Sequence, residues 1–225
     1  MKLINLISFF YKDSFDYINK DNLNDIIEGL KWHIDHLIDY GWKKEDLIIK
    51  TNFPFTYKDI SAQPFYYQKC DNLFLTKIIA AYEVLKENPE TIVWQHDNDT
   101  YQIRAFDKEH LSKHIINDVN LCNYWPGNSR PQGASVFYKF FSPTLQDMYL
   151  RIVSKNINLC DELFFMYYIS HYNHSISLDL PYEYNTSITR YTHSKRSSKE
   201  PYCIHGDTKR RFDKKLFHRY MDLYK

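Results

Sequence analysis

Hydrophobic positions along the chain fall into short continuous runs and longer stretches with a helical period. Residues 3–9 and 92–96 are apolar runs of strand length, typical of strands that are buried on both faces. Residues 23–40 and 73–88 repeat apolar side chains at three- and four-residue intervals, which predicts two amphipathic helices. With a short strand expected at 46–50, this β-α-β-α-β order predicts a doubly wound, mostly parallel sheet.

The second half of the chain continues with strands and helices and shows no internal repeat. No stretch rich in proline, glycine or serine separates two units, so we expect one α/β domain over residues 1–225. The remaining elements are expected as strands at 119–124 and 134–140, helices at 108–114, 143–155, 161–171 and 214–224, and loops at 52–64 and 192–201.

Two carboxylates follow the apolar run at 92–96 directly. Asp97 and Asp99 are separated by one residue, and residues i and i+2 of an extended chain face the same side. Carboxylate oxygens that converge at the carboxyl end of a strand suit Mg²⁺ or Mn²⁺ together with substrate phosphates. The alternative is a solvated turn in which Asp97 caps the following residues.

A histidine, a glycine and two lysines suit the same phosphate chemistry. His205 can ligate Mn²⁺, Gly206 lets the backbone approach phosphates, and Lys209 can neutralise their charge. Lys77, in the helix before the carboxylate pair, can reach a nucleotide ribose or phosphate. The alternatives are a surface turn with a basic tail and a solvated lysine on a helix face.

Small and acidic residues mark two further positions. Gly133, Ala134 and Ser135 leave room for a sugar against the backbone, or form an ordinary junction between a loop and a strand. Asp161 and Glu162 open a predicted helix, where acids are favoured by capping and the helix dipole. Their functional interpretation is a carboxylate that binds sugar hydroxyls or acts as a base.

Composition limits the partners and the compartment. The formal net charge is +1, so no global field favours nucleic acid or an anionic membrane. No segment reaches transmembrane length, and the apolar run at 1–10 lacks a signal cleavage site. The richness in Asn, Ile, Lys, Tyr and Phe fits the AT-rich genome of a low-GC bacterium, a phage or a large DNA virus. Four dispersed cysteines without a CxxC pair predict reduced thiols in the cytoplasm: Cys70, Cys122, Cys160 and Cys203.

Taken in order, the segments from about residue 73 to residue 209 resemble a GT-A glycosyltransferase. The order is a Thr-Lys helix, an Asp-x-Asp strand end, a Gly-small strand, an acidic helix start and a late His-Gly-x-x-Lys segment. The resemblance is to the glycogenin-like and galactosyltransferase-like retaining enzymes and to small viral or phage glycosyltransferase-like proteins. It implies an α/β, Rossmann-like, mostly parallel sheet with flanking helices, with nucleotide binding in about residues 1–100 and acceptor and sugar binding in about 101–225.

The resemblance also implies a role for each matching residue. Asp99 and His205 would ligate Mn²⁺ or Mg²⁺, and Asp97 would ligate it or hold the donor. Asp161 would grip the transferred sugar. The implied donor-binding residues are Ser8, Phe9, Lys77, Asp97, Gly133, Ala134, Ser135, Gly206 and Lys209. The spacing from His205 to Lys209 is one residue shorter than the usual pattern of the family.

The implied reaction is metal-dependent transfer of a sugar from a nucleotide diphosphate donor to an acceptor hydroxyl. A UDP-sugar is favoured, and the acceptor is a glycan, a protein or a small molecule in the cytoplasm (the host's, for a viral protein). If configuration is inverted, Asp161 or Glu162 is the candidate catalytic base; if it is retained, the leaving phosphate can assist. Two other functions stay open: a non-catalytic nucleotide-sugar-binding or interaction protein, and another metal-dependent phosphoester enzyme. No nucleic-acid partner is expected, and the oligomeric state is left open.

Overall fold

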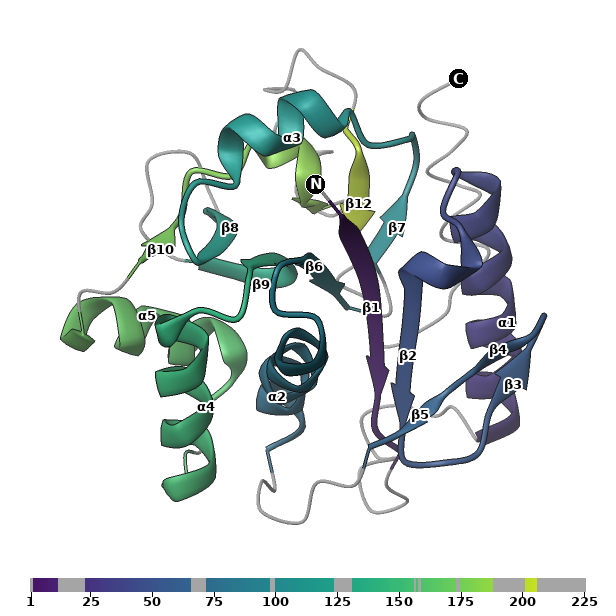
Figure 1. The fold of residues 1–225 in the computed structure, drawn as a ribbon, viewed down its shortest axis with the longest axis horizontal. Coiled ribbons are helices and arrows are strands. Elements are labelled where there is room, and N and C mark those ends of the chain that lie inside the picture. The colour runs from purple at the N-terminus through teal and green to yellow at the C-terminus, as the bar shows by residue number, and fades with distance from the viewer. Residues whose placement is uncertain are drawn as a thin grey trace.

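A seven-stranded sheet organises the chain in the computed structural model (Figure 1). The structure describes residues 2–11, 23–65, 72–97, 100–123, 131–155, 157, 159–172, 175–187 and 201–205. The strand order is β10-β8-β9-β6-β1-β2-β5. These strands are β1 Leu3–Phe9, β2 Leu47–Thr51, β5 Gln63–Pro64, β6 Ile92–His96, β8 Val119–Asn123, β9 Pro131–Lys139 and β10 Ile176–Ser177.

The sheet is mostly parallel, as the sequence predicts. Strand β1 pairs in parallel with β2 and β6, and β5 and β10 also add in parallel. Among the described strands of this sheet, β9 alone runs the opposite way, antiparallel to both β6 and β8. The amino end of β9 therefore lies beside the carboxyl end of β6, where His96 pairs with Ser135.

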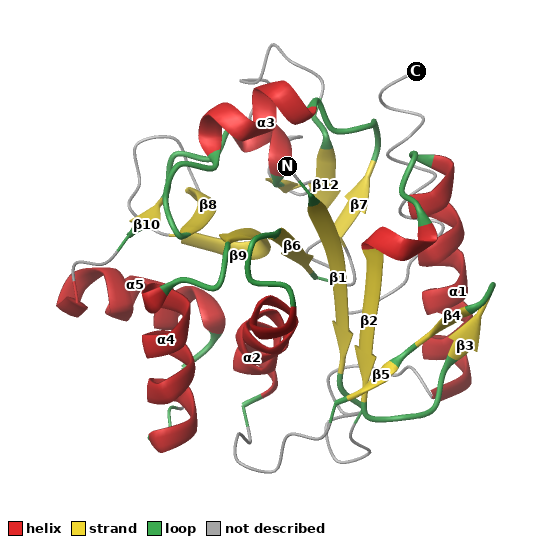
Figure 2. Cartoon of the chain, in the orientation of Figure 1, coloured by secondary structure: helices red, strands yellow, loops and turns green. Residues whose placement is uncertain are grey.

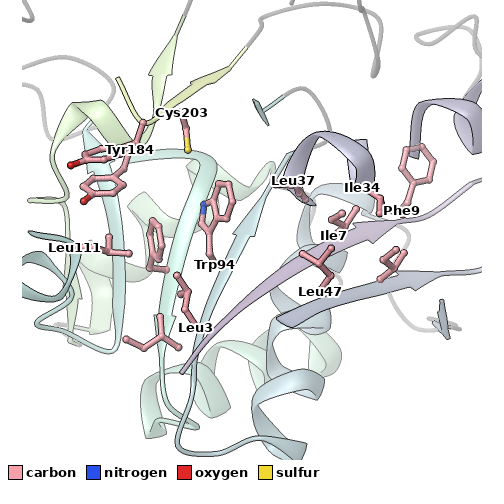
Figure 3. Packing of buried hydrophobic residues seen from close by; sticks show 14 of the residues in the cluster. Leu3, Ile7, Phe9, Ile34, Leu37, Leu47, Trp94, Leu111, Tyr184 and Cys203 are labelled. Carbon is pink, nitrogen blue, oxygen red and sulfur yellow. The ribbon is translucent and has the colours of Figure 1, made fainter. Parts of the chain in front are cut away.

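Helices cover both faces of the sheet, because alternate residues of its strands are apolar on each side (Figure 2). In β1, Leu3 and Ile7 belong to the core on the face covered by α1 and α3, whereas Ile4 and Leu6 belong to the core on the face covered by α2, α4 and α5. Figure 3 shows part of the core on the α1 face, where Trp94 of β6 lies near Leu3 and Cys203 and its ring packs against the rings of Phe106 and Phe137. The helices are α1 Leu23–Asp39, α2 Leu73–Glu87, α3 Lys108–His114, α4 Pro143–Ser154 and α5 Asp161–Tyr172.

A second, three-stranded sheet stands next to the carboxyl end of β6. Its order is β11-β12-β7, and β12 pairs antiparallel with β7. Its strands are β7 Thr100–Gln102, β11 Thr186–Ser187 and β12 Cys203–His205. The remaining short elements are the hairpin of β3 Thr56–Tyr57 and β4 Ile60–Ser61, and the 3-10 turns η2 Lys44–Asp46 and η3 Tyr182–Tyr184. None of the described helices is long and apolar enough to cross a membrane.

The sequence predictions for the long elements within the described residues are confirmed. The strands at 3–9 and 92–96 and the helix at 108–114 have the predicted bounds. The expected loop at 52–64 instead contains a hairpin and β5, which extends the main sheet. Strand β9 begins at Pro131, before the predicted start, because proline is tolerated at the first position of a strand.

Two predicted segments lie outside the described residues. They are the loop at 192–201 and the helix at 214–224.

Candidate active site

Lys77 is the centre of a charged cluster at the carboxyl end of β6. Its Nζ lies 2.5 Å from Oδ1 of Asp97 and 2.6 Å from Oδ2 of Asp161. It also donates to the carbonyl oxygen of Gly133, at 3.3 Å. These residues come from α2, the end of β6, the start of α5 and β9. The structure thus brings together four residues that the sequence singled out.

The Lys77 side chain is held as a buried cation. Burial by itself lowers the pKa of the ammonium, but the charges and hydrogen bonds of Asp161 and Asp97 outweigh that cost, and the net pKa is raised. With both acids ionised, the cluster carries one excess negative charge. Lys77 is therefore not a solvated lysine on a helix face, and its contact with a nucleotide ribose or phosphate stays a prediction.

Gly133 permits the close approach of Asp161. A Cβ atom built on Gly133 would lie only 1.8 Å from Oδ2 of Asp161, so no other residue fits there without a shift of the carboxylate. The pairing of β9 with β8 changes register at this place, from Leu121 opposite Val136 to Cys122 opposite Gln132. Such an irregularity bends a strand locally.

The backbone after β6 forms a tight turn that fixes Asp97. The amide of Thr100 donates to the carbonyl oxygen of Asp97 at 3.0 Å, and the amide of Asp97 donates to Ala134 at 2.9 Å. The Thr100 hydroxyl also donates to the carbonyl oxygen of Ala134, at 3.0 Å. The Asp97 carboxylate is bound by Lys77; the alternative, a cap on the residues that follow Asp97, falls on Asn98 and Asp99, outside the described residues.

His96 supports this turn from the opposite side of the strand. Its Nδ1 lies 3.0 Å from the carbonyl oxygen of Asp97, and its Nε2 lies 3.0 Å from the side-chain amide of Asn5. The pKa of His96 is lowered to about 4, chiefly by burial; the hydrogen bond to the Asp97 backbone and the Asp97 charge oppose this, and the charge of Lys77 adds to it. His96 is therefore neutral near pH 7. Sequence reasoning missed it, although it immediately precedes the carboxylate pair.

The predicted metal ligands are only partly described. Asp97 is described, Asp99 is not, and His205 is described in its backbone alone. The register of β12 with β7 places His205 directly opposite Thr100, the residue after Asp99. Within the described part of the chain, no group of three or more His, Cys, Asp or Glu side chains could hold a metal ion.

The other predicted donor-site residues are placed as follows. Phe9 is buried in the core against Phe53, so its ring does not line an open surface. The Ser135 hydroxyl accepts a hydrogen bond of 2.8 Å from Nε1 of Trp94. Ser8 is half-buried beside β2.

Three more residues are predicted for the site. Glu162 is half-buried and follows Asp161 in α5. Gly206 and Lys209 lie outside the described residues.

Comparison with known proteins gives matches in structure only. No family model matches the chain, and no curated protein matches it in sequence. The fold is similar to that of the glycosyltransferase GlyE of Streptococcus pneumoniae (TM-score 0.55, 11% identity), over 91% of this chain and 54% of that one. It is also similar to a glycosyltransferase involved in glycosylation of the major capsid of PBCV-1 (TM-score 0.54, 11% identity), over 90% of this chain and 93% of that one. A third similar structure is the galactosyltransferase LgtC with donor and acceptor sugar analogs (TM-score 0.51, 7% identity), over 91% of this chain and 87% of that one.

These similarities establish the GT-A type of fold for this chain. The chain spans about half the length of GlyE and nearly the whole of the PBCV-1 enzyme. The low identities limit the comparison to architecture, since one fold can carry different functions.

Proposed function

We propose that this protein is a metal-dependent glycosyltransferase. It moves a sugar from a nucleotide diphosphate donor, a UDP-sugar by preference, to an acceptor hydroxyl. The observation that carries the proposal is the Lys77 ammonium bound between Asp97 and Asp161 at the carboxyl end of β6. Ligands of open α/β sheets bind at this edge, and the fold is shared with glycosyltransferases.

The residues that we assign to a divalent cation offer the donor atoms that such an ion prefers. Lys77 engages Oδ1 of Asp97, which leaves Oδ2 of a side chain that is 36% exposed. Asp99 and His205 are the other proposed ligands, and oxygen with imidazole donors suits Mn²⁺ or Mg²⁺. When bound, the ion would offset the charge of the departing diphosphate.

The side chains of the protein have separate roles in the proposed reaction. Lys77, permanently charged, fixes the orientation of both carboxylates. Because Oδ2 of Asp161 is bound to Lys77, its Oδ1 is left to accept hydrogen bonds from sugar hydroxyls. We assign Glu162 as the base candidate if the reaction inverts configuration. Gly206 and Lys209 are assigned to the diphosphate.

The first test is a thermal-shift screen of UDP-, GDP-, CMP- and TDP-sugars, each with and without Mn²⁺. A ligand that binds only the native state raises its melting temperature, so we expect a shift that needs one nucleotide and the metal together. Asp99→Asn should abolish that shift and the transfer reaction while the fold survives. The matched control is Asp59→Asn, in an exposed turn of the β3–β4 hairpin, which should keep both.

Three outcomes contradict the proposal in different ways. Full transfer activity of Asp99→Asn would remove the metal-site assignment. Metal-dependent nucleotide binding without transfer to any acceptor would favour the non-catalytic function, and phosphate release from simple esters would favour a phosphoester enzyme.

A further inference from the structure

Asn72 precedes α2 and caps it. Its Oδ1 accepts a hydrogen bond of 3.1 Å from the amide of Phe74. An asparagine in this position satisfies one of the amide groups that a helix start leaves without an intrahelical partner. The cap fixes the first turn of the helix that carries Lys77 one turn further on.

The other end of the same amide group reaches a different part of the chain. Its Nδ2 donates to the carbonyl oxygen of Leu159, and to that of Ile157 at 3.3 Å. With an amide N–H at Oδ1 and two carbonyl oxygens at Nδ2, the orientation of the Asn72 side chain is determined by its partners.

These carbonyl groups belong to the connection between α4 and α5, which ends at Asp161. The other described backbone hydrogen bonds of this connection are local, from Ile157 to Lys155 and from Phe164 to Cys160. Asn72 therefore provides a long-range bond between the start of α2 and the segment that leads into α5.

We propose that Asn72 is a positioning residue that sets the distance between Lys77 and Asp161. This inference rests on the proposed function, because it assigns that charged pair to the reaction. Lys77 lies in α2 and Asp161 begins α5. Asn72 joins the start of α2 to the segment that leads into α5, so both charged residues lie within a few residues of its hydrogen bonds. A site needs its charged groups held to about 0.5 Å, and Asn72 restrains both elements with one side chain.

The two functions of Asn72 can be separated by substitution. Ser and Asp are helix caps about as good as Asn, but neither presents an amide N–H to the carbonyl groups of Ile157 and Leu159. Asn72→Ser and Asn72→Asp should therefore keep the cap and lose the connection. We expect kcat to fall about tenfold or more in both variants, with KM for the donor changed much less.

The control is Ser142→Ala. Ser142 caps α4 by accepting a hydrogen bond of 3.2 Å from the amide of Leu145. It follows the carboxyl end of β9, at the edge of the sheet remote from Asp97. This variant loses a cap of the same kind without touching the pair, so its kcat should match that of the wild-type protein even where its melting temperature falls.

A double-mutant cycle tests the same inference without any enzyme assay. Asp161→Asn is expected to lower the melting temperature in both backgrounds. If Asn72 positions the pair, this decrease should be smaller in the Asn72→Ser background than in the wild-type background, by at least about 2 °C. The same substitution combined with Ser142→Ala should be additive.

Additivity of Asn72→Ser with Asp161→Asn overturns the proposal, whatever the activity. A wild-type kcat in Asn72→Ser overturns it as well. If the wild-type protein transfers no sugar with any donor, the proposed function fails, and the cycle alone still decides whether Asn72 restrains the charged pair.

Discussion

At the scale of single residues, close approach and burial decide the state of each charged group. Lys77 and Asp161 meet in a space that Gly133 leaves open. A glycine in such a place is required by space, since its backbone does not have a positive φ angle. The sequence indicates small residues at 133–135, but it does not reveal which side chain fills the room that they leave.

Gly133→Ala should displace the Asp161 carboxylate from Lys77, because the added methyl group occupies the position of Oδ2. We expect a loss of about a hundredfold in transfer rate, measured as initial rate at saturating donor. The matched control is Gly41→Ala. Gly41 has a φ of 91° and open space around its Cβ position, so this variant should lose stability by about 1 kcal/mol and keep its activity. Equal rates for both variants would contradict the role of Gly133.

His96 gives the protein a stability that depends on pH. Its pKa falls from 6.5 in the unfolded chain to about 4 in the folded protein, so the unfolded chain binds the proton more readily below pH 6.5. Stability is therefore lost as the pH falls from 6.5 to 4, by a maximum of about 3 kcal/mol from this residue.

The measurement is urea unfolding of the metal-free protein across that range. His96→Gln should show a flatter decline toward low pH than the wild-type protein, since an amide does not titrate. His171→Gln, at an exposed position in α5, should keep the wild-type slope. Identical slopes for His96→Gln and the wild-type protein would contradict the assignment.

At the scale of elements, long segments follow from the sequence pattern and short ones do not. The helix α2 has a clear helical period and ends one residue before its predicted limit, and the strand β6 is an apolar run with the predicted limits. Strands β7 and β12 have three residues each, too few for any period to show. They form because β12 pairs with β7, which is remote in sequence. A local sequence pattern does not show such a pairing.

The pairing of β12 with β7 is what brings His205 to the Asp97 turn. Ile204, beside His205, is fully buried, so Ile204→Ala should loosen β12 at a cost of about 2–5 kcal/mol. We expect the metal-dependent part of nucleotide binding to weaken more than the metal-independent part, as measured by calorimetry with and without Mn²⁺. The control is Ile152→Ala in α4, which is equally buried. A similar effect of both variants on metal-dependent binding would count against a role for β12.

At the scale of the whole molecule, the sequence predicts the class of sheet and the helices that flank it. It also indicates Lys77, Asp97, Gly133 and Asp161 as separate candidates, and these meet in the structure. Their meeting depends on the reversed direction of β9 and on the N-terminus of α5 lying over it. Those are properties of the assembled sheet, so no local pattern contains them. The contacts of Asn72 and His96 likewise reach residues remote in sequence, Ile157 and Asn5.

The Lys77 cluster also has a consequence for how the chain matures. During synthesis the N-terminal parts of a chain emerge first, so α2 and β6 leave the ribosome before α5. Until α5 arrives, the Lys77 ammonium lacks the Asp161 carboxylate that shares its burial, and a half-paired buried charge is costly. The parallel strands β1, β2 and β6 can therefore pair early in synthesis. The charged cluster around Lys77 is expected to form only after the later half of the chain has been synthesised. A nascent chain halted before residue 161 would carry α2 and β6 with the Lys77 ammonium lacking its Asp161 partner.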